Sequence, residues 1–214
     1  MEKSAEENKR NRRPRRSKAD IDRAIEQATI EQIKQTGFVH SQVTDIVKRA
    51  EIEPVVFYNR YKNLDEFFDQ FAKNHSNWLN ETQHEQKNPT NADEYAEALD
   101  SLFDYLLSND LIAELLRWEL AEYTPTTKNL VIEHEADLIE YTDKLARRAK
   151  AISISDAKTI SALVIAGLYY MILNKKNSNF AGIDITTLDG KQRIYKALKL
   201  IGTILYQRPN KITR

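Results

Sequence analysis

The sequence has no cysteine and only five glycines and five prolines in 214 residues. The lack of cysteine excludes disulfide bridges, thiolate metal sites and cysteine nucleophiles, and it suits a reducing compartment. So few glycines and prolines disfavour a β fold with many tight turns. A chain of this length can form one large domain, or a small module joined to a larger one.

Long apolar runs are missing as well. The longest, residues 160–173, has 14 positions and includes Ser161 and Gly167, whereas a membrane-spanning helix needs about 20 apolar residues. The first ten residues, MEKSAEENKR, are charged throughout and do not fit a secretory signal. We therefore expect a cytoplasmic protein that makes no membrane contact.

The net charge is zero, but the charges are unevenly distributed. Residues 9–18 contain seven basic residues and no acidic one. Residues 1–62 carry 14 basic and 10 acidic residues, a net charge of +4, so the remainder carries −4. A basic end on an acidic body is typical of nucleic-acid contact, although a solvated tail would have the same composition.

Apolar residues recur at helical spacing along most of the chain, and no period-2 alternation or hairpin dipeptide is found. Ser41, Asn63, Asp110 and Ser155 are expected to cap helices, and Gly37 to end one. The predicted helices cover residues 18–36, 42–50, 54–61, 64–79, 93–107, 111–122, 127–150, 155–175 and 188–206, with a loop at 87–93. The fold class is therefore all-α, with about nine helices.

The stretch EIEPVVFYNRYKNLDEFF at residues 51–68 is the most informative. The helices at 42–50 and 54–61, joined by a three-residue turn, form a helix-turn-helix. Its second helix would lie in a DNA major groove. Val56 and Phe57 are expected to face inward and seat this helix. The opposite face would carry Glu53, Val55 and Asn59, with Tyr58 and Lys62 directed to phosphate oxygens.

At these residues the chain resembles the TetR (tetracycline-repressor-like) family of transcriptional regulators. The matching positions, within about residues 20–68, are Gly37-Phe38, Ser41, Val43, Ile46-Val47, Ala50, Ile52, Phe57-Tyr58, Tyr61 and Asp65-Glu66-Phe67. The chain departs from the family pattern at Glu51, where glycine is usual, at Val55, where glycine or proline is common, and at Arg60 and Leu64. Because glutamate rather than glycine occupies position 51, we expect the turn to be strained.

The resemblance implies a homodimeric regulator, typically a repressor, that binds a palindromic DNA operator and is released by a small-molecule inducer; no cofactor is expected. It divides the chain into a basic N-terminal arm at residues 1–17, a helix-turn-helix domain at 18–64, and a ligand-binding and dimerisation domain at 65–214. Arg12 belongs to the arm, which can enter the minor groove. The expected DNA contacts are Arg13, Arg15, Arg16, Ser41, Gln42, Glu53, Pro54, Val55, Tyr58, Asn59, Arg60 and Lys62.

Two further sets of residues follow from the resemblance. The candidate ligand pocket consists of Trp78, Phe103, Trp118, Tyr123, His134, Tyr141 and Tyr169, for each of which ordinary core packing is the alternative. The candidate dimer interface consists of Ile165, Tyr169, Ile172, Ile194, Leu198, Ile201 and Leu205, on two helices that would form a four-helix interface with a partner.

Other classes of function have less support. The four histidines show no metal-ligand spacing, and the sequence contains no GxSxG, P-loop or dinucleotide motif. We therefore expect no enzymatic activity. The main alternative is an α-helical adaptor that keeps the fold but has lost DNA binding. Glu51 in the turn and Leu64 in place of a phosphate-binding lysine are the features that favour it.

Overall fold

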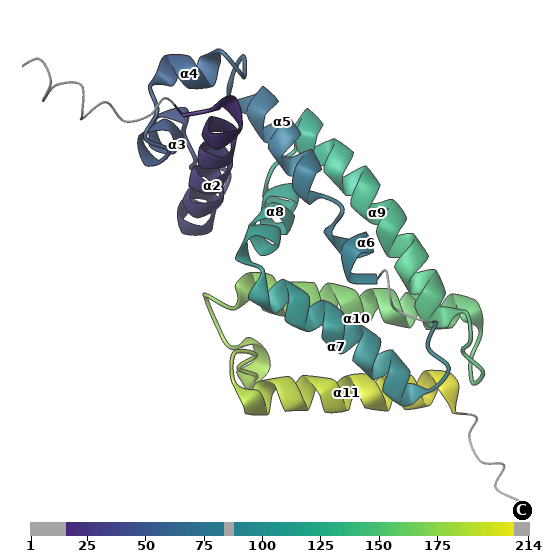
Figure 1. Cartoon of the computed structure of the whole chain (residues 1–214). Coiled ribbons are helices and arrows are strands. Elements are labelled where there is room, and N and C mark those ends of the chain that lie inside the picture. Colours follow the sequence, from purple (N-terminus) through teal and green to yellow (C-terminus); the bar gives the residue numbers. More distant parts are fainter. Residues whose placement is uncertain (1–15, 84–87, 208–214) are drawn as a thin grey trace, which may run out of the picture.

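The structure is a computed structural model, and it describes residues 16–83 and 88–207. Every regular element within these ranges is helical, which confirms the all-α prediction. A small N-terminal unit comprises α2 (Lys18–Thr36), α3 (Val43–Arg49) and α4 (Pro54–Tyr58). In Figure 1 this unit lies at one end of the molecule, and α5 leads from it to the larger helical body.

The ends of α2 and α3 are set by local hydrogen bonds. Ser17 and Asp20 form a capping box at the start of α2, and Gly37, with φ of 77°, ends it as predicted. The predicted cap of α3 by Ser41 is wrong, because Gln42 occupies that position. Ser41 is buried and donates its hydroxyl hydrogen to the Gly37 carbonyl at 2.7 Å, so it closes the loop between the two helices.

The fourth helix is shorter than predicted. Pro54 lies in its first turn, where the missing N–H costs nothing. The helix ends at Tyr58 rather than at residue 61, because the Arg60 N–H bonds to the Phe57 carbonyl in a tighter turn. Asn63 then caps α5 by accepting from the Glu66 N–H, as predicted.

The predicted single helix over residues 64–79 is divided into α5 (Leu64–His75) and α6 (Trp78–Gln83). The break lies at Ser76, whose hydroxyl donates to the Lys73 carbonyl at 3.1 Å and to Glu133 at 3.3 Å. The Ser76 carbonyl accepts from Nε2 of His134 at 2.9 Å. Partners on a distant helix thus replace the helical bonds that would continue α5.

The body consists of α6 and the longer helices that follow it. These are α7 (Ala92–Ser108), α8 (Asp110–Ala121), α9 (Pro125–Ala146), α10 (Ile154–Asn174) and α11 (Leu188–Tyr206), with a short 3₁₀ turn, η1 (Phe180–Gly182), before α11. The bounds of α11 agree with the prediction. The caps of α8 and α10 are Asn109 and Ser153, not the predicted Asp110 and Ser155.

The helices of the body form one continuous core. Helices α7 and α11 run side by side (Figure 1). At Gly202 a Cβ atom would lie 2.8 Å from the Ala92 carbonyl oxygen, so only glycine permits this approach. Helix α10 is long and apolar enough to cross a membrane by length and composition alone, but a core helix passes the same test, and α10 packs against α7, α8 and α9.

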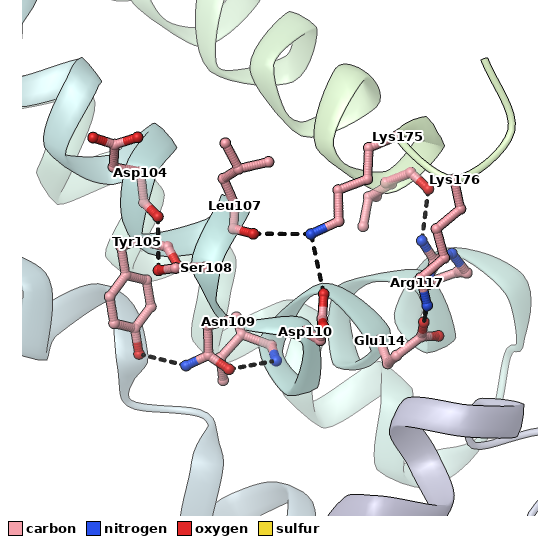
Figure 2. Close-up of polar contacts among 12 residues, drawn as sticks. Asp104, Tyr105, Leu107, Ser108, Asn109, Asp110, Glu114, Arg117, Lys175 and Lys176 are labelled. Atoms are coloured by element: carbon pink, nitrogen blue, oxygen red, sulfur yellow. Dashed lines mark hydrogen bonds and ion pairs between the residues drawn. The ribbon is translucent and has the colours of Figure 1, made fainter. Parts of the chain in front are cut away.

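Polar contacts hold the corner between α7 and α8 against the end of α10, as Figure 2 shows. The Lys175 ammonium donates to the Leu107 carbonyl at 2.9 Å and to Asp110 at 3.0 Å. Arg117 donates to the Leu173 carbonyl at 2.6 Å. Three backbone or carboxylate oxygens on three helices, α7, α8 and α10, are satisfied in this way, which fixes α8 relative to α10.

A second core joins the N-terminal unit to the body. It includes Phe57 of α4, but also side chains of α5, α8 and α9. The Phe38 ring stacks on Trp118 of α8, with centroids 4.5 Å apart and planes 5° from parallel. The predicted domain boundary at residue 64 therefore runs through a shared core, and α5 and α8 seat the N-terminal unit on the body.

Candidate nucleic-acid interface

Helix α4 is buried on one side and open on the other. Phe57 is fully buried, and its ring packs against Tyr61 and Phe67 at centroid distances of 5.1 and 5.3 Å. On the opposite side Val55 is 61% exposed and Tyr58 is 54% exposed. The other predicted contacts that are exposed are Gln42, Glu53, Pro54, Asn59 and Lys62. A short helix with a rigid seat and a free outer face meets the steric requirement for insertion into a major groove.

Arg60 does not belong to this free surface. Its Nε donates to Asp22 of α2 at 2.7 Å, and one terminal nitrogen donates to the Val56 carbonyl at 2.9 Å. Its side chain is only 17% exposed. The predicted role of Arg60 in phosphate binding is therefore unsupported by its position, because the guanidinium already joins α4 to α2.

Arg16 lies at the turn of the helix-turn-helix. It donates to the Ala50 carbonyl at 2.7 Å, and its guanidinium lies 3.5 Å from the Glu51 carboxylate. The φ angle of Glu51 is 51°, which confirms the strained turn predicted from the lack of glycine. Arg16 thus supports the turn. The predicted contacts Arg12, Arg13 and Arg15 lie outside the described residues.

The predicted ligand residues do not all lie together. Trp78, His134 and Tyr169 come together, with the Trp78 ring 5.8 Å from His134 and 6.4 Å from Tyr169 between centroids. Phe103 and Tyr141 belong to the same core, where the Tyr141 hydroxyl donates to the Ala98 carbonyl at 2.9 Å. Trp118 belongs instead to the core under the N-terminal unit. Tyr123 is 86% exposed and lines neither core.

His134 is held between two acceptors. Nδ1 lies 3.0 Å from a carboxylate oxygen of Glu119 on α8, and Nε2 lies 2.9 Å from the Ser76 carbonyl. Burial disfavours the imidazolium, but the Glu119 hydrogen bond and charge outweigh burial, and the pKa of His134 is raised. Glu119 was not predicted, because a glutamate on an amphipathic helix carries no sequence signal of burial.

The predicted dimer residues lie mostly in the protomer's own core. Ile165, Ile172, Ile194, Leu198 and Leu205 are buried there, and Tyr169 and Ile201 are half-buried. These five buried side chains are not available to a partner. The outer faces of the same two helices carry exposed apolar residues: Leu163 and Tyr170 on α10, and Leu200 and Ile204 on α11.

Two grooves border these elements. One, of about 270 Å³, lies between α9 and α10 and is lined by Glu135, Leu138, Ile139, Thr142, Ala162, Ile165, Ala166 and Tyr169. The other, of about 680 Å³, lies at the junction of the N-terminal unit and the body, between the segment at Phe38, the start of α5 and the start of α9.

No family model matches the chain, and no curated protein matches its sequence. Solved structures do match. A TetR-like transcriptional regulator from Rhodococcus sp. RHA1 has a TM-score of 0.65 and 17% identity, covering 88% of this chain and 98% of that one. A transcriptional regulator from Aquifex aeolicus VF5 has a TM-score of 0.62 and 19% identity, covering 85% and 99%.

A third match is FadR from Bacillus subtilis, a transcriptional regulator solved in complex with stearoyl-CoA. It has a TM-score of 0.54 and 16% identity, and the match covers 82% of this chain and 96% of that one. At such low identities the likeness concerns the fold. The chain has the fold of TetR-like transcriptional regulators, which confirms the fold implied by the motifs at residues 20–68.

Proposed function

We propose that the protein is a sequence-specific DNA-binding transcriptional regulator of the cytoplasm, and that α4 is its recognition helix. The observation that carries the proposal is the seating of α4: Phe57 is buried, whereas Val55 and Tyr58 on the same five-residue helix are exposed. Lys62 follows at an exposed position suited to a phosphate. The fold shared with TetR-like regulators supports the same function.

The regulator acts as a homodimer on a palindromic operator. Two recognition helices read half-sites about one helical turn apart, which a single copy of this chain cannot supply. The outer faces of α10 and α11 support this arrangement, because exposed apolar side chains such as Leu163 and Leu200 are better covered by a partner than by water. An isologous pairing of these two helices forms a four-helix interface.

A small-molecule inducer shifts the dimer between DNA-binding and released states. The body connects to the N-terminal unit through α5 and through the contact of Trp118 with Phe38. A ligand that favours one position of α8 or α5 therefore changes the spacing of the two recognition helices. Repression released by the ligand is the expected direction of control.

Fluorescence anisotropy tests DNA binding. The purified protein is titrated onto the DNA upstream of its own gene and onto a scrambled duplex, across a salt series. We expect tighter binding to the native fragment and a steep decrease of log K with log salt. If the protein binds both duplexes equally weakly, its binding sites are next selected from a pool of random DNA duplexes. Failure to bind any selected duplex contradicts the proposal and favours the adaptor.

A further inference from the structure

Four polar side chains from four helices meet inside the body. This inner polar cluster consists of Trp78 of α6, Glu119 of α8, His134 of α9 and Tyr169 of α10. The Trp78 ring contacts both His134 and Tyr169, and Glu119 forms an ion pair with His134 at 2.9 Å. The charge of Glu119 also acts on the Tyr169 hydroxyl. The four side chains therefore lie next to one another in the core.

Trp78 Nε1 and the Tyr169 hydroxyl are buried without a hydrogen-bond partner among the described residues, and Glu119 Oε1 accepts no hydrogen bond although it lies 2.9 Å from His134 Nδ1. Both carboxylate oxygens of Glu119 lie close to His134 Nδ1, Oε1 at 2.9 Å and Oε2 at 3.0 Å, but the hydrogen bond goes to Oε2, so Oε1 keeps lone pairs with which it can accept. Buried polar groups in folded proteins are almost always paired, so three unpaired atoms in one cluster require an explanation. They indicate a polar group, supplied from outside the chain, that all three can bind.

The chemistry of the three atoms limits what that group can be. The Trp78 indole only donates, the Glu119 carboxylate only accepts, and the Tyr169 hydroxyl can do both. Burial, together with the charge of Glu119, raises the pKa of Tyr169, so it remains a neutral hydroxyl. The matching group must accept from Trp78 and donate to Glu119. A hydroxyl or a primary carboxamide does both.

Charged groups fit the cluster poorly. A carboxylate has no proton for Glu119 and would be repelled by it, while an ammonium cannot accept from Trp78. When it is protonated, His134 balances the charge of Glu119, so a further charge would be buried without a counter-ion. The cluster therefore favours a neutral group over either ion.

An apolar surface adjoins the cluster. Tyr169 also lines the groove of about 270 Å³ between α9 and α10, together with Leu138, Ile139 and other mainly apolar side chains. We propose that the protein binds a small, neutral, largely apolar molecule whose hydroxyl or carboxamide group is held by Trp78, Glu119 and Tyr169. This inference rests on the proposed function in one respect: the molecule is taken to be the small-molecule inducer proposed above, and the inference names its chemical class.

The two tryptophans of the chain provide a direct test. In protein labelled with ¹⁵N-tryptophan, each indole N–H gives one NMR signal. Trp118 donates to Glu122 at 2.8 Å and serves as an internal reference, whereas Trp78 has a free donor. Phenol, benzamide, benzoate and benzylammonium are matched probes that differ in the polar group. We expect phenol and benzamide, but neither ion, to shift the Trp78 signal in a saturable manner and to leave that of Trp118 in place.

Variants establish which atoms are responsible. Tyr169→Phe keeps the ring and removes one hydroxyl, so it should weaken phenol binding about fivefold, the effect of one lost hydrogen bond. Glu119→Gln should also weaken it. Glu122→Gln is the matched control, which should move the Trp118 signal and leave phenol binding at Trp78 unchanged.

Two outcomes overturn the proposal. Absence of any probe-induced shift at Trp78 means that water alone pairs the three atoms. Equal shifts with the neutral and the charged probes mean that the cluster does not select the polar group. Neither measurement contains DNA, so the result is separable from operator binding. A protein that binds phenol at Trp78 but no duplex keeps this inference and loses the proposed function.

Discussion

At the scale of single residues, sequence chemistry identified positions whose role depends on near neighbours. Pro54 in the first turn of α4, Gly37 at the end of α2 and the buried Phe57 were all predicted. The predicted cap by Ser41 is wrong, because nothing in the sequence indicates that its hydroxyl turns back to the Gly37 carbonyl, and the ion pair of Arg60 was missed, because Asp22 lies 38 residues before it. A basic or hydroxyl side chain near a recognition helix can either bind DNA or stabilise the fold.

Lys62 and Arg60 should therefore behave differently. Lys62→Ala removes one positive charge that would contact a DNA phosphate, so it should lower DNA affinity and reduce the slope of log K against log salt by about 1. Arg60→Ala loses a partly buried ion pair and a bond to the Val56 carbonyl, and should lower the free energy of unfolding by about 1 kcal/mol. Anisotropy across a salt series and thermal unfolding distinguish the two effects.

Asp22→Asn is the control for Arg60, since it weakens the same ion pair without changing a residue of the proposed DNA-binding face. It should lower stability in the same direction and leave the salt slope unchanged. If Arg60→Ala reduces the slope while stability remains at the native value, Arg60 is a phosphate contact and its assignment to the fold is wrong.

Glu51 offers a second prediction at this scale. Its φ of 51° costs a residue with a Cβ atom about 1 kcal/mol, whereas glycine adopts this conformation freely. Glu51→Gly should therefore raise the free energy of unfolding by up to about 1 kcal/mol, even though the carboxylate near Arg16 is lost. Glu51→Ala loses the same carboxylate but keeps the strain. Chemical denaturation should rank glycine above alanine, and the reverse order contradicts the strained turn.

At the scale of helices, most of the elements were predicted from apolar spacing, and their bounds were correct to within a few residues. Errors arose where a cap had two adjacent candidates, as with Asn109 and Asp110. The break between α5 and α6 was missed for another reason. The sequence of residues 64–79 remains compatible with one helix, and the interruption comes from Glu133 and His134, about 58 residues further on.

The contact between α9 and this break should depend on pH. The pKa of His134 is raised in the folded protein, so its stabilising contribution is complete below the unfolded value of about 6.5 and is lost as pH rises through the folded pKa. His134→Gln should lower the free energy of unfolding at pH 6 by about 3 kcal/mol, because Glu119 is left buried without a cation. It should also remove the decrease in stability above pH 6.5.

Thermal unfolding of both proteins from pH 5.5 to 9 measures this difference. The other three histidines are present in both, so the change in pH dependence reports on His134. His40→Gln is the matched control, since His40 is exposed. Parallel pH profiles for the wild type and His134→Gln would show that His134 does not titrate as a stabilising cation.

At the scale of the whole molecule, the fold class followed from the sequence, but the faces of α10 and α11 did not. Helix α10 is apolar nearly all round, so its spacing does not indicate which face meets the protomer. On α11 the stripe at Ile194, Leu198 and Leu205 was assigned to the partner, although it packs into the protomer's own core. An apolar stripe along a helix indicates only that this face of the helix is covered by another element. Only the position of α7 shows which helix covers it.

The last prediction concerns the exposed face of α11, opposite the stripe that packs into the core. Leu200 and Ile204 lie one turn apart on α11, at 65% and 54% exposure. Leu200→Glu combined with Ile204→Glu should leave the fold intact, because both side chains point away from the core, but should convert the proposed dimer to a monomer. The monomer holds one recognition helix, so its operator affinity should decrease by at least about tenfold. Leu198→Glu, by contrast, places a charge in the protomer core and should lower stability by several kcal/mol, on the order of 3 or more.

Leu120→Glu is the matched control, since Leu120 is equally apolar and 78% exposed but lies on α8. Light scattering gives the mass, circular dichroism the fold, and anisotropy the affinity for each protein. A double variant that remains dimeric would exclude this face of α11 as the dimer interface, because two carboxylates per protomer cannot be buried there unpaired. The interface would then have to be sought elsewhere, beginning with the exposed Leu163 and Tyr170 on α10.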